Sequence, residues 1–173
     1  MLRPLVRRTL APRGQTPHRL VRGRHRQKVS AIAALTLSPR RRRVGLVWHT
    51  LRDASFTGAT VAAFLRRLLR RVRGRVTVVW DRWTGHGGPA VRAVLAAHPR
   101  LTIERLPAYA PDLNPVEHLW SLVKWGELCN FAPADAAELD AAVRPLLARL
   151  ARSQPLLRGC WRGARLHVPR WRC

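Results

Sequence analysis

The chain has 173 residues, enough for one domain, and carries 33 Lys and Arg against 9 Asp and Glu, a formal net charge of +24. Such an excess of one sign repels itself unless an anionic partner neutralises it, so nucleic acid is the leading candidate partner. The three cysteines, Cys129, Cys160 and Cys173, are odd in number and lack Cys/His spacing, which argues against a disulfide framework and a zinc centre.

The first part of the chain predicts a lead-in, a hairpin and a helix. Residues 1–28 are basic, punctuated by Pro and Gly, and show no period, so we expect an irregular lead-in. Residues 29–37 and 44–50 are short apolar runs separated by a basic turn, which predicts two hairpin strands. Over 58–73 apolar residues recur at helical spacing with arginines on the other faces, which predicts an amphipathic helix.

The middle of the chain predicts a strand, a helix and a second strand. Gly74 ends the preceding helix, and residues 76–81 follow as an almost unbroken apolar run. Such a run is typical of a strand buried on both faces in the middle of a sheet. A Gly-rich turn, a short helix over 89–98 and a strand at 101–106 come next, so the pattern predicts an α/β fold.

The last part of the chain predicts helices and a loose tail. A Pro-rich loop leads into a helix over 115–128, and a helical region spans 134–152, where Pro145 should break or kink it. The tail, 153–173, is basic, contains Trp161 and Trp171, and is expected to be loosely packed. Because no stretch of about 18 apolar residues and no signal peptide occurs, we expect a soluble cytoplasmic protein without membrane contact.

Asp81 closes the predicted strand at 76–81 and is the first candidate site residue. Ligands and catalytic groups gather at the carboxyl ends of strands in open α/β sheets. The competing interpretation is that Asp81 caps the following turn, which is ordinary for Asp after a strand. His86, five residues later, could position a substrate or a water molecule, or could simply be solvated in a Gly-rich turn.

Glu117 begins the helix predicted over 115–128 and is the second candidate. Asn114 suits the N-cap, Pro115 the first helical position and Glu117 the third, which is the spacing of a capping box. The alternative is that Glu117 lies on the flank of the packing face, near the end of the sheet, where it could reach a metal ion shared with Asp81. The residues alone leave both interpretations open.

Residues 78–128, which contain VVWDRWTGH and LPAYAPDLNPVEHLW, resemble the second half of the catalytic domain of bacterial insertion-sequence transposases related to the mariner group, in the DDE superfamily. The resemblance rests on the strand that ends in Asp81, the downstream His86, the proline-rich loop and the 35 residues between Asp81 and Glu117. Weaker similarity extends over about residues 5–152.

The resemblance implies a ribonuclease-H-like mixed sheet flanked by helices over residues 29–152. It also implies two-metal phosphoryl transfer, in which carboxylates hold two Mg²⁺ or Mn²⁺ ions that activate water or a DNA 3′-hydroxyl. By position, Asp81 corresponds to the second acid of the family and Glu117 to the third, while His86 accompanies them. The implied function is DNA cleavage and strand transfer at transposon ends.

Two departures from the family pattern affect these expectations. Arg82 stands where many relatives have Asn, which alters contacts near the metals without removing a ligand. The first Asp of the family lies on a strand just upstream of the segment matched by residues 4–17, so we expect that the first strand and its Asp are lacking. Asp53, after the second hairpin strand, is a poor substitute, and we expect a truncated or second-frame product with an incomplete metal site and low activity.

The basic residues are expected to bind double-stranded DNA whether or not the metal site is complete. The candidate contacts are Arg40, Arg41, Arg42, Arg43, Arg66, Arg67, Arg70, Arg71, Arg82 and Lys124. The competing hypotheses are a non-catalytic basic DNA-binding remnant that pairs with or competes against a full-length transposase, and a small ribosomal-type protein. We also expect a homodimer or pairing with an upstream-frame product, and association with the bacterial nucleoid.

Overall fold

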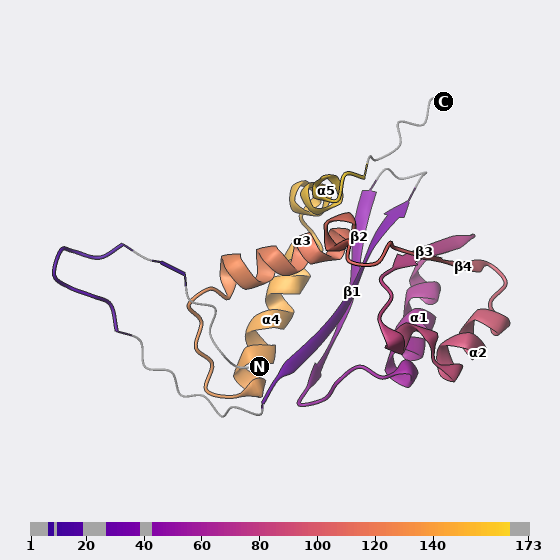
Figure 1. The fold of residues 1–173 in the computed structure, drawn as a ribbon, viewed down its shortest axis with the longest axis horizontal. Helices are drawn as coiled ribbons and strands as arrows, with labels where there is room; N and C mark the ends of the chain where they lie inside the picture. Colours follow the sequence, from indigo (N-terminus) through magenta and orange to yellow (C-terminus); the bar gives the residue numbers. More distant parts are fainter. Residues whose placement is uncertain (1–6, 9, 19–26, 39–42, 167–173) are drawn as a thin grey trace.

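A computed structural model describes residues 7–8, 10–18, 27–38 and 43–166 (Figure 1). The predicted hairpin is confirmed: β1 (Val29–Ser38) pairs antiparallel with β2 (Arg43–Arg52), in a register that sets Val29 opposite Arg52. Lys28 and Asp53 close the open end of the hairpin, because Asp53 N donates to Lys28 O at 2.9 Å and Lys28 N donates to Asp53 Oδ1 at 3.0 Å. Asp53 therefore has a structural role at the end of the hairpin.

Helix α1 (Gly58–Arg71) confirms the predicted amphipathic helix. Thr57 is the N-cap and forms a capping box with Thr60, which satisfies free N–H groups of the first turn. At the other end, Arg100 donates to the carbonyls of Val72 at 2.8 Å and Gly74 at 2.6 Å, and Gly74 turns the chain with φ +79°. The buried face of α1 comprises Val61, Ala62, Phe64, Leu65, Leu68 and Leu69.

Strand β3 (Val76–Trp80) pairs in parallel with β4 (Leu101–Arg105) through helix α2 (Pro89–Ala97), as the strand–helix–strand pattern predicted. The prediction that β3 is buried on both faces in mid-sheet is wrong for the described residues. Val76 is buried but Val79 is 56 % exposed, and the described strands form two two-stranded sheets, β1–β2 and β3–β4. Only the face of β3 that carries Val76, Val78 and Trp80 packs against the core shared with α1 and α2.

Helix α3 (Pro115–Ser121) continues as a π-helical segment (Leu122–Glu127). The predicted helix over 115–128 is therefore confirmed, but its C-terminal half is π-helical and not α-helical. Helix α4 (Ala136–Leu150) confirms the next prediction, and Pro145 lies inside it without ending it. Pro145 is exposed, so water can reach the carbonyl that lacks its N–H partner. None of the described helices is long and apolar enough to cross a membrane.

The predicted loose tail is wrong for its first part, because Gln154–Gly163 forms helix α5. Leu157 and Cys160 are buried and Trp161 packs beside them, at the i, i+3, i+4 spacing of a helix face. Arg158 and Arg162 are interspersed with these residues, so the apolar face of the helix is hard to recognise in the sequence. Trp171 lies outside the described residues.

The hairpin separates two apolar cores, because successive side chains along each strand point to opposite faces of the hairpin. Val47 joins the core of α1, α2, β3 and β4, whereas Val44 and Leu46 join the core formed with α3, α4 and α5. Figure 1 shows α3, α4 and α5 on one side of the hairpin and α1 and α2 on the other. The α/β fold with antiparallel and parallel strand pairs flanked by helices is therefore confirmed.

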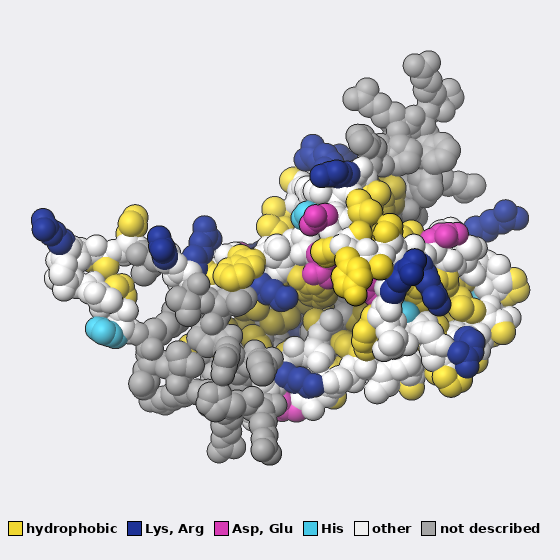
Figure 2. Space-filling model, viewed as in Figure 1, with side chains coloured by type: hydrophobic (Ala, Val, Ile, Leu, Met, Phe, Trp, Pro, Cys, Tyr) yellow, Lys and Arg dark blue, Asp and Glu magenta, His cyan; other side chains and the backbone are white. Residues whose placement is uncertain are grey.

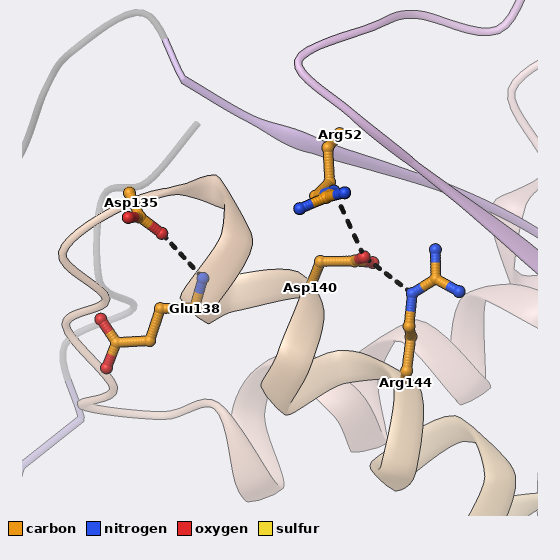
Figure 3. Close-up of polar contacts among 5 residues, drawn as sticks. All are labelled: Arg52, Asp135, Glu138, Asp140 and Arg144. Carbon is orange, nitrogen blue, oxygen red and sulfur yellow. Dashed lines mark hydrogen bonds and ion pairs between the residues drawn. The ribbon is translucent and has the colours of Figure 1, made fainter.

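An ion-pair network fixes α4 to β2 (Figure 3). Asp140 is buried, accepts from Arg144 Nε at 2.7 Å and lies 3.9 Å from Arg52 Nε. Burial by itself would raise the pKa of Asp140, but the Thr50 hydroxyl and the two guanidinium groups outweigh burial and hold the pKa below its usual value. Asp140 is thus ionised at neutral pH, as a buried carboxylate with two cationic partners should be.

Candidate metal-binding site

A pocket of about 360 Å³ lies at the carboxyl ends of β3 and β4, where parallel strands bring their following loops together. Asp81 follows the last residue of β3, and Leu106 follows the last residue of β4. Leu106 N donates to Trp80 O at 2.8 Å and extends the pairing to the edge of the pocket. The pocket is lined by Asp81, Arg82, Leu106, Pro107, Ala108, Tyr109, Ala110, Pro111, Asn114 and Glu117.

The side chain of Asp81 is 55 % exposed and uses one oxygen within the protein. Its Oδ1 accepts from Trp83 N at 3.0 Å and lies 3.1 Å from His86 Nδ1. Oδ2 has no hydrogen-bond partner among the described residues. Both interpretations of Asp81 are therefore compatible, since Oδ1 caps the turn after β3 while Oδ2 is free to bind a ligand.

His86 is held between two tryptophans in the turn after β3. Its side chain is 15 % exposed, stacks on Trp80 with ring centroids 4.2 Å apart, and meets Trp83 edge-on at 5.2 Å. Nδ1 also lies 3.2 Å from the Asp81 carbonyl, and because both nearby Asp81 oxygens are acceptors, Nδ1 must carry the proton that is donated. The interpretation of His86 as a solvated residue is wrong, because it fixes the backbone and the carboxylate of Asp81.

Glu117 is the third residue of α3, and its side chain has no hydrogen bond or ion pair among the described residues. Asn114 is the N-cap as predicted, because its Oδ1 accepts from Val116 N at 3.1 Å. The reciprocal half of a capping box is not formed, since Asn114 N donates to Pro111 O at 2.9 Å instead. Glu117 is therefore exposed at the pocket with a free carboxylate, beside the partial positive charge of the helix N-terminus.

Arg82 and Tyr109 also line the pocket. Arg82 Nε donates to Leu106 O at 3.3 Å and so links the loops that follow the two strands. Tyr109 is fully exposed and adopts φ 56°, a conformation that is uncommon for a residue with a side chain. Sequence reasoning did not single out Tyr109, although its place between two prolines in the loop LPAYAP was a signal that the backbone there is constrained.

The other predicted DNA contacts lie away from the pocket lining. Arg66, Arg70 and Arg71 are exposed on α1, Arg67 is half-buried there, and the remaining described residues Arg43 and Lys124 are exposed. Arg40, Arg41 and Arg42 lie outside the described residues. Figure 2 shows one face of the molecule, on which Lys and Arg side chains are spread around a few acidic ones.

The chemistry of the pocket suits a hard divalent cation. Asp81 Oδ2 and the Glu117 carboxylate are oxygen donors, and Mg²⁺ and Mn²⁺ prefer such ligands. Neither carboxylate forms an ion pair with Lys or Arg among the described residues. No group of three or more His, Cys, Asp or Glu in that part of the chain is placed to share a metal ion, so the described site offers a pair of carboxylates.

Comparison with known proteins identifies the fold. Solved structures that the fold matches include the Mos1 strand transfer complex (TM-score 0.62, 21 % identity), the Mos1 transposase paired-end complex with left transposon end (0.63, 20 %) and the catalytic domain of Mos1 mariner transposase (0.58, 19 %). The first two matches cover 94 % of this chain but only 46 % and 47 % of the longer chains, and the third covers 82 % of this chain and 76 % of the catalytic domain.

These structural matches confirm the ribonuclease-H-like fold. A comparison with curated protein sequences gave no match. The sequence itself matches the family described as DDE superfamily endonuclease over residues 1–135. Because this match extends over most of the chain, the protein belongs to the DDE superfamily endonucleases.

Proposed function

We propose that this chain acts in DNA transposition, as part of a transposase catalytic domain in which Asp81 and Glu117 bind Mg²⁺ or Mn²⁺. The observation that carries the proposal is that these two carboxylates, separated by 35 residues in the sequence, line one pocket and keep oxygens that no other described residue uses. One of the similar solved structures is a Mos1 mariner paired-end complex with Mn, which supports the same class of cation.

The residues around the pair have distinct tasks in this proposal. A bound divalent cation would supply Lewis-acid activation of water or of a DNA 3′-hydroxyl and would offset charge on the scissile phosphate. His86 and the Trp83 N–H hold Asp81 Oδ1 and so fix the carboxylate, which lines the pocket and would bind the cation through Oδ2. Arg82 places a cationic side chain on the pocket wall, where it can attract a phosphate group.

Double-stranded DNA at transposon ends is the proposed partner. The titles of similar structures name a transposon end and strand transfer for Mos1, and the +24 charge of this chain favours a polyanion. The exposed arginines of α1 would contact phosphates, which position the protein without reading sequence. Pairing with a second chain is part of the proposal, because the Mos1 structures that support it are assembled complexes.

The activity of the isolated chain is proposed to be low. Two carboxylates hold a pair of metal ions more weakly than three, so a third acid supplied by another segment or chain would complete the site. Plasmid DNA incubated with the chain and Mg²⁺ or Mn²⁺ should therefore show little nicking. Strong nicking that Asp81→Asn abolishes would contradict the need for a third acid.

Metal-dependent DNA binding tests the proposal without requiring turnover. We expect Mn²⁺ to raise the affinity of the chain for a duplex with a free 3′-hydroxyl, measured by fluorescence anisotropy at fixed ionic strength. Asp81→Asn and Glu117→Gln should remove this increase and leave the metal-free affinity unchanged. Asp112→Asn is the matched control, because Asp112 is exposed on the same loop but does not line the pocket. Equal Mn²⁺ responses in all four proteins would refute the proposal and favour a non-catalytic DNA-binding protein.

A further inference from the structure

Helix α5 packs directly against α3, the helix that carries Glu117. Leu157 and Cys160 of α5 are buried in one cluster with Leu119 of α3 and Val123 of the π-helical segment that follows α3. The first turn of α5 is also tied to the hairpin, because Gln154 Nε2 donates to Val44 O at 2.7 Å and Gln154 Oε1 accepts from Val44 N at 3.1 Å. Helix α5 is thus a fixed support for α3, although it lies beyond the family match that ends at residue 135.

The two helices approach each other tightly at Gly163 and His118. A Cβ atom added to Gly163 would lie 3.1 Å from Cε1 and Nδ1 of His118 and 3.2 Å from Cδ2. These distances are shorter than ordinary van der Waals contacts, so even an alanine here would force the imidazole ring or the helix to move by a few tenths of an ångström. Gly163 does not have a positive φ, so its lack of a side chain provides space and not backbone freedom.

His118 is held by packing at this contact. Its Nε2 is buried and has no hydrogen-bond partner among the described residues. His118 directly follows Glu117 in the first turns of α3, and successive helical residues point about 100° apart. The turn that presents Glu117 to the pocket therefore presents the His118 ring to α5, so a displacement of this turn at His118 would also displace Glu117.

We infer that Gly163 is a positioning residue for Glu117: the space it leaves seats His118 against α5 and so sets the orientation of the Glu117 carboxylate at the pocket. The inference rests on the proposed role of Glu117 as a metal ligand. Binding constellations must be held to within about 0.5 Å, so a displacement of a few tenths of an ångström at His118 uses up much of the tolerance of a metal ligand on the same helical turn. The C-terminal helix thereby becomes part of the metal-site architecture without contacting the metal.

Helix α5 contains its own control for this inference. Gly159 lies one turn before Gly163, and a Cβ atom added there would meet nothing within 4 Å. Gly159→Ala therefore changes the same residue type in the same helix without a steric effect. Both variants gain the higher helix propensity of alanine. Only Gly163→Ala should disturb His118.

The test is a Mn²⁺ titration of the full chain, followed by water-proton relaxation, with far-UV circular dichroism and thermal unfolding recorded for each variant. We expect Gly163→Ala to stay folded and to lower Mn²⁺ affinity at least about 3-fold, while Gly159→Ala keeps the wild-type affinity. A purely structural glycine would change the unfolding midpoint and leave the Mn²⁺ affinity of the folded protein unchanged. Equal Mn²⁺ affinities in the two alanine variants would overturn the inference.

His118→Ala provides a second test. It asks whether Gly163→Ala acts on Mn²⁺ binding through the His118 ring. In that background the ring is absent, so adding Gly163→Ala should cost less than about 1.5-fold in Mn²⁺ affinity; a full loss there would overturn the inference. If Gly163→Ala alone does not fold, the double variant must fold and bind Mn²⁺ as His118→Ala does. Glu117→Gln distinguishes the two levels, because unchanged Mn²⁺ affinity in Glu117→Gln refutes the proposed function itself.

Discussion

Truncation of Leu157 tests whether α5 is an integral part of the fold. Leu157 is fully buried, at 0 % exposure, in the core that contains Leu119 of α3. Leu→Ala substitutions at such sites cost about 2–5 kcal/mol, because apolar contacts are lost and a cavity is left. For a chain of this length each kcal/mol lowers the melting temperature by about 2–4 °C, so about 3 kcal/mol for Leu157→Ala corresponds to a fall of roughly 6–12 °C.

The neighbouring residue Leu156 provides a control for Leu157→Ala. It is 43 % exposed on the same helix, so Leu156→Ala should change the unfolding free energy by no more than about 0.5 kcal/mol. Calorimetry of both variants at one pH and salt concentration measures the difference. Similar melting temperatures for Leu156→Ala and Leu157→Ala would refute the docking of α5 and remove the basis for its influence on α3.

Three further outcomes are expected from charged and titratable residues. Asp140→Asn should lower the unfolding free energy in urea by about 1–3 kcal/mol, because the amide oxygen can still accept a hydrogen bond but the guanidinium groups lose the negative charge that they pair with; no loss would contradict the network of Figure 3. Burial and the nearby charge of Arg67 lower the pKa of His49 below 6.5, so stability should fall as the pH drops below about 6.5, and His49→Gln should flatten this dependence. Replacing Arg66 and Arg70 by Ala should reduce the slope of log affinity for duplex DNA against log salt by about 1.8 if both contact phosphates, and an unchanged slope would exclude α1 as a DNA contact.

Most helices and strands could be predicted from the sequence because the spacing of their apolar residues is regular over the whole element. The apolar spacing of α1 and the two runs of the hairpin are local signals, and each describes a face that packs as expected. The same reasoning failed for α5, because the exposed Arg158 and Arg162 lower the average hydrophobicity of the segment that holds Leu157, Cys160 and Trp161. A helix with a narrow apolar face is visible only when the partner that buries it is known.

The candidate site was predictable in its acids but not in its supporting contacts. Asp81 and Glu117 follow recognisable signals, namely the end of a strand and the start of a helix. The position of His86 between Trp80 and Trp83 depends on how the turn folds back over the strand. The spacing of apolar residues in the sequence does not predict such a turn. The approach of Gly163 to His118 joins residues 45 positions apart, so only the tertiary structure reveals it.

The central claim is that Asp81 and Glu117 together form one binding site for divalent cations. Its most direct test is the stoichiometry and affinity of Mn²⁺ binding to the wild-type chain, Asp81→Asn, Glu117→Gln and the control Asp112→Asn. A shared site predicts that either substitution at the pocket removes most of the bound Mn²⁺, whereas the control binds as the wild type does. If each pocket variant instead kept about half of the bound Mn²⁺ at unchanged affinity, or if neither differed from Asp112→Asn, the two carboxylates would not form a metal site.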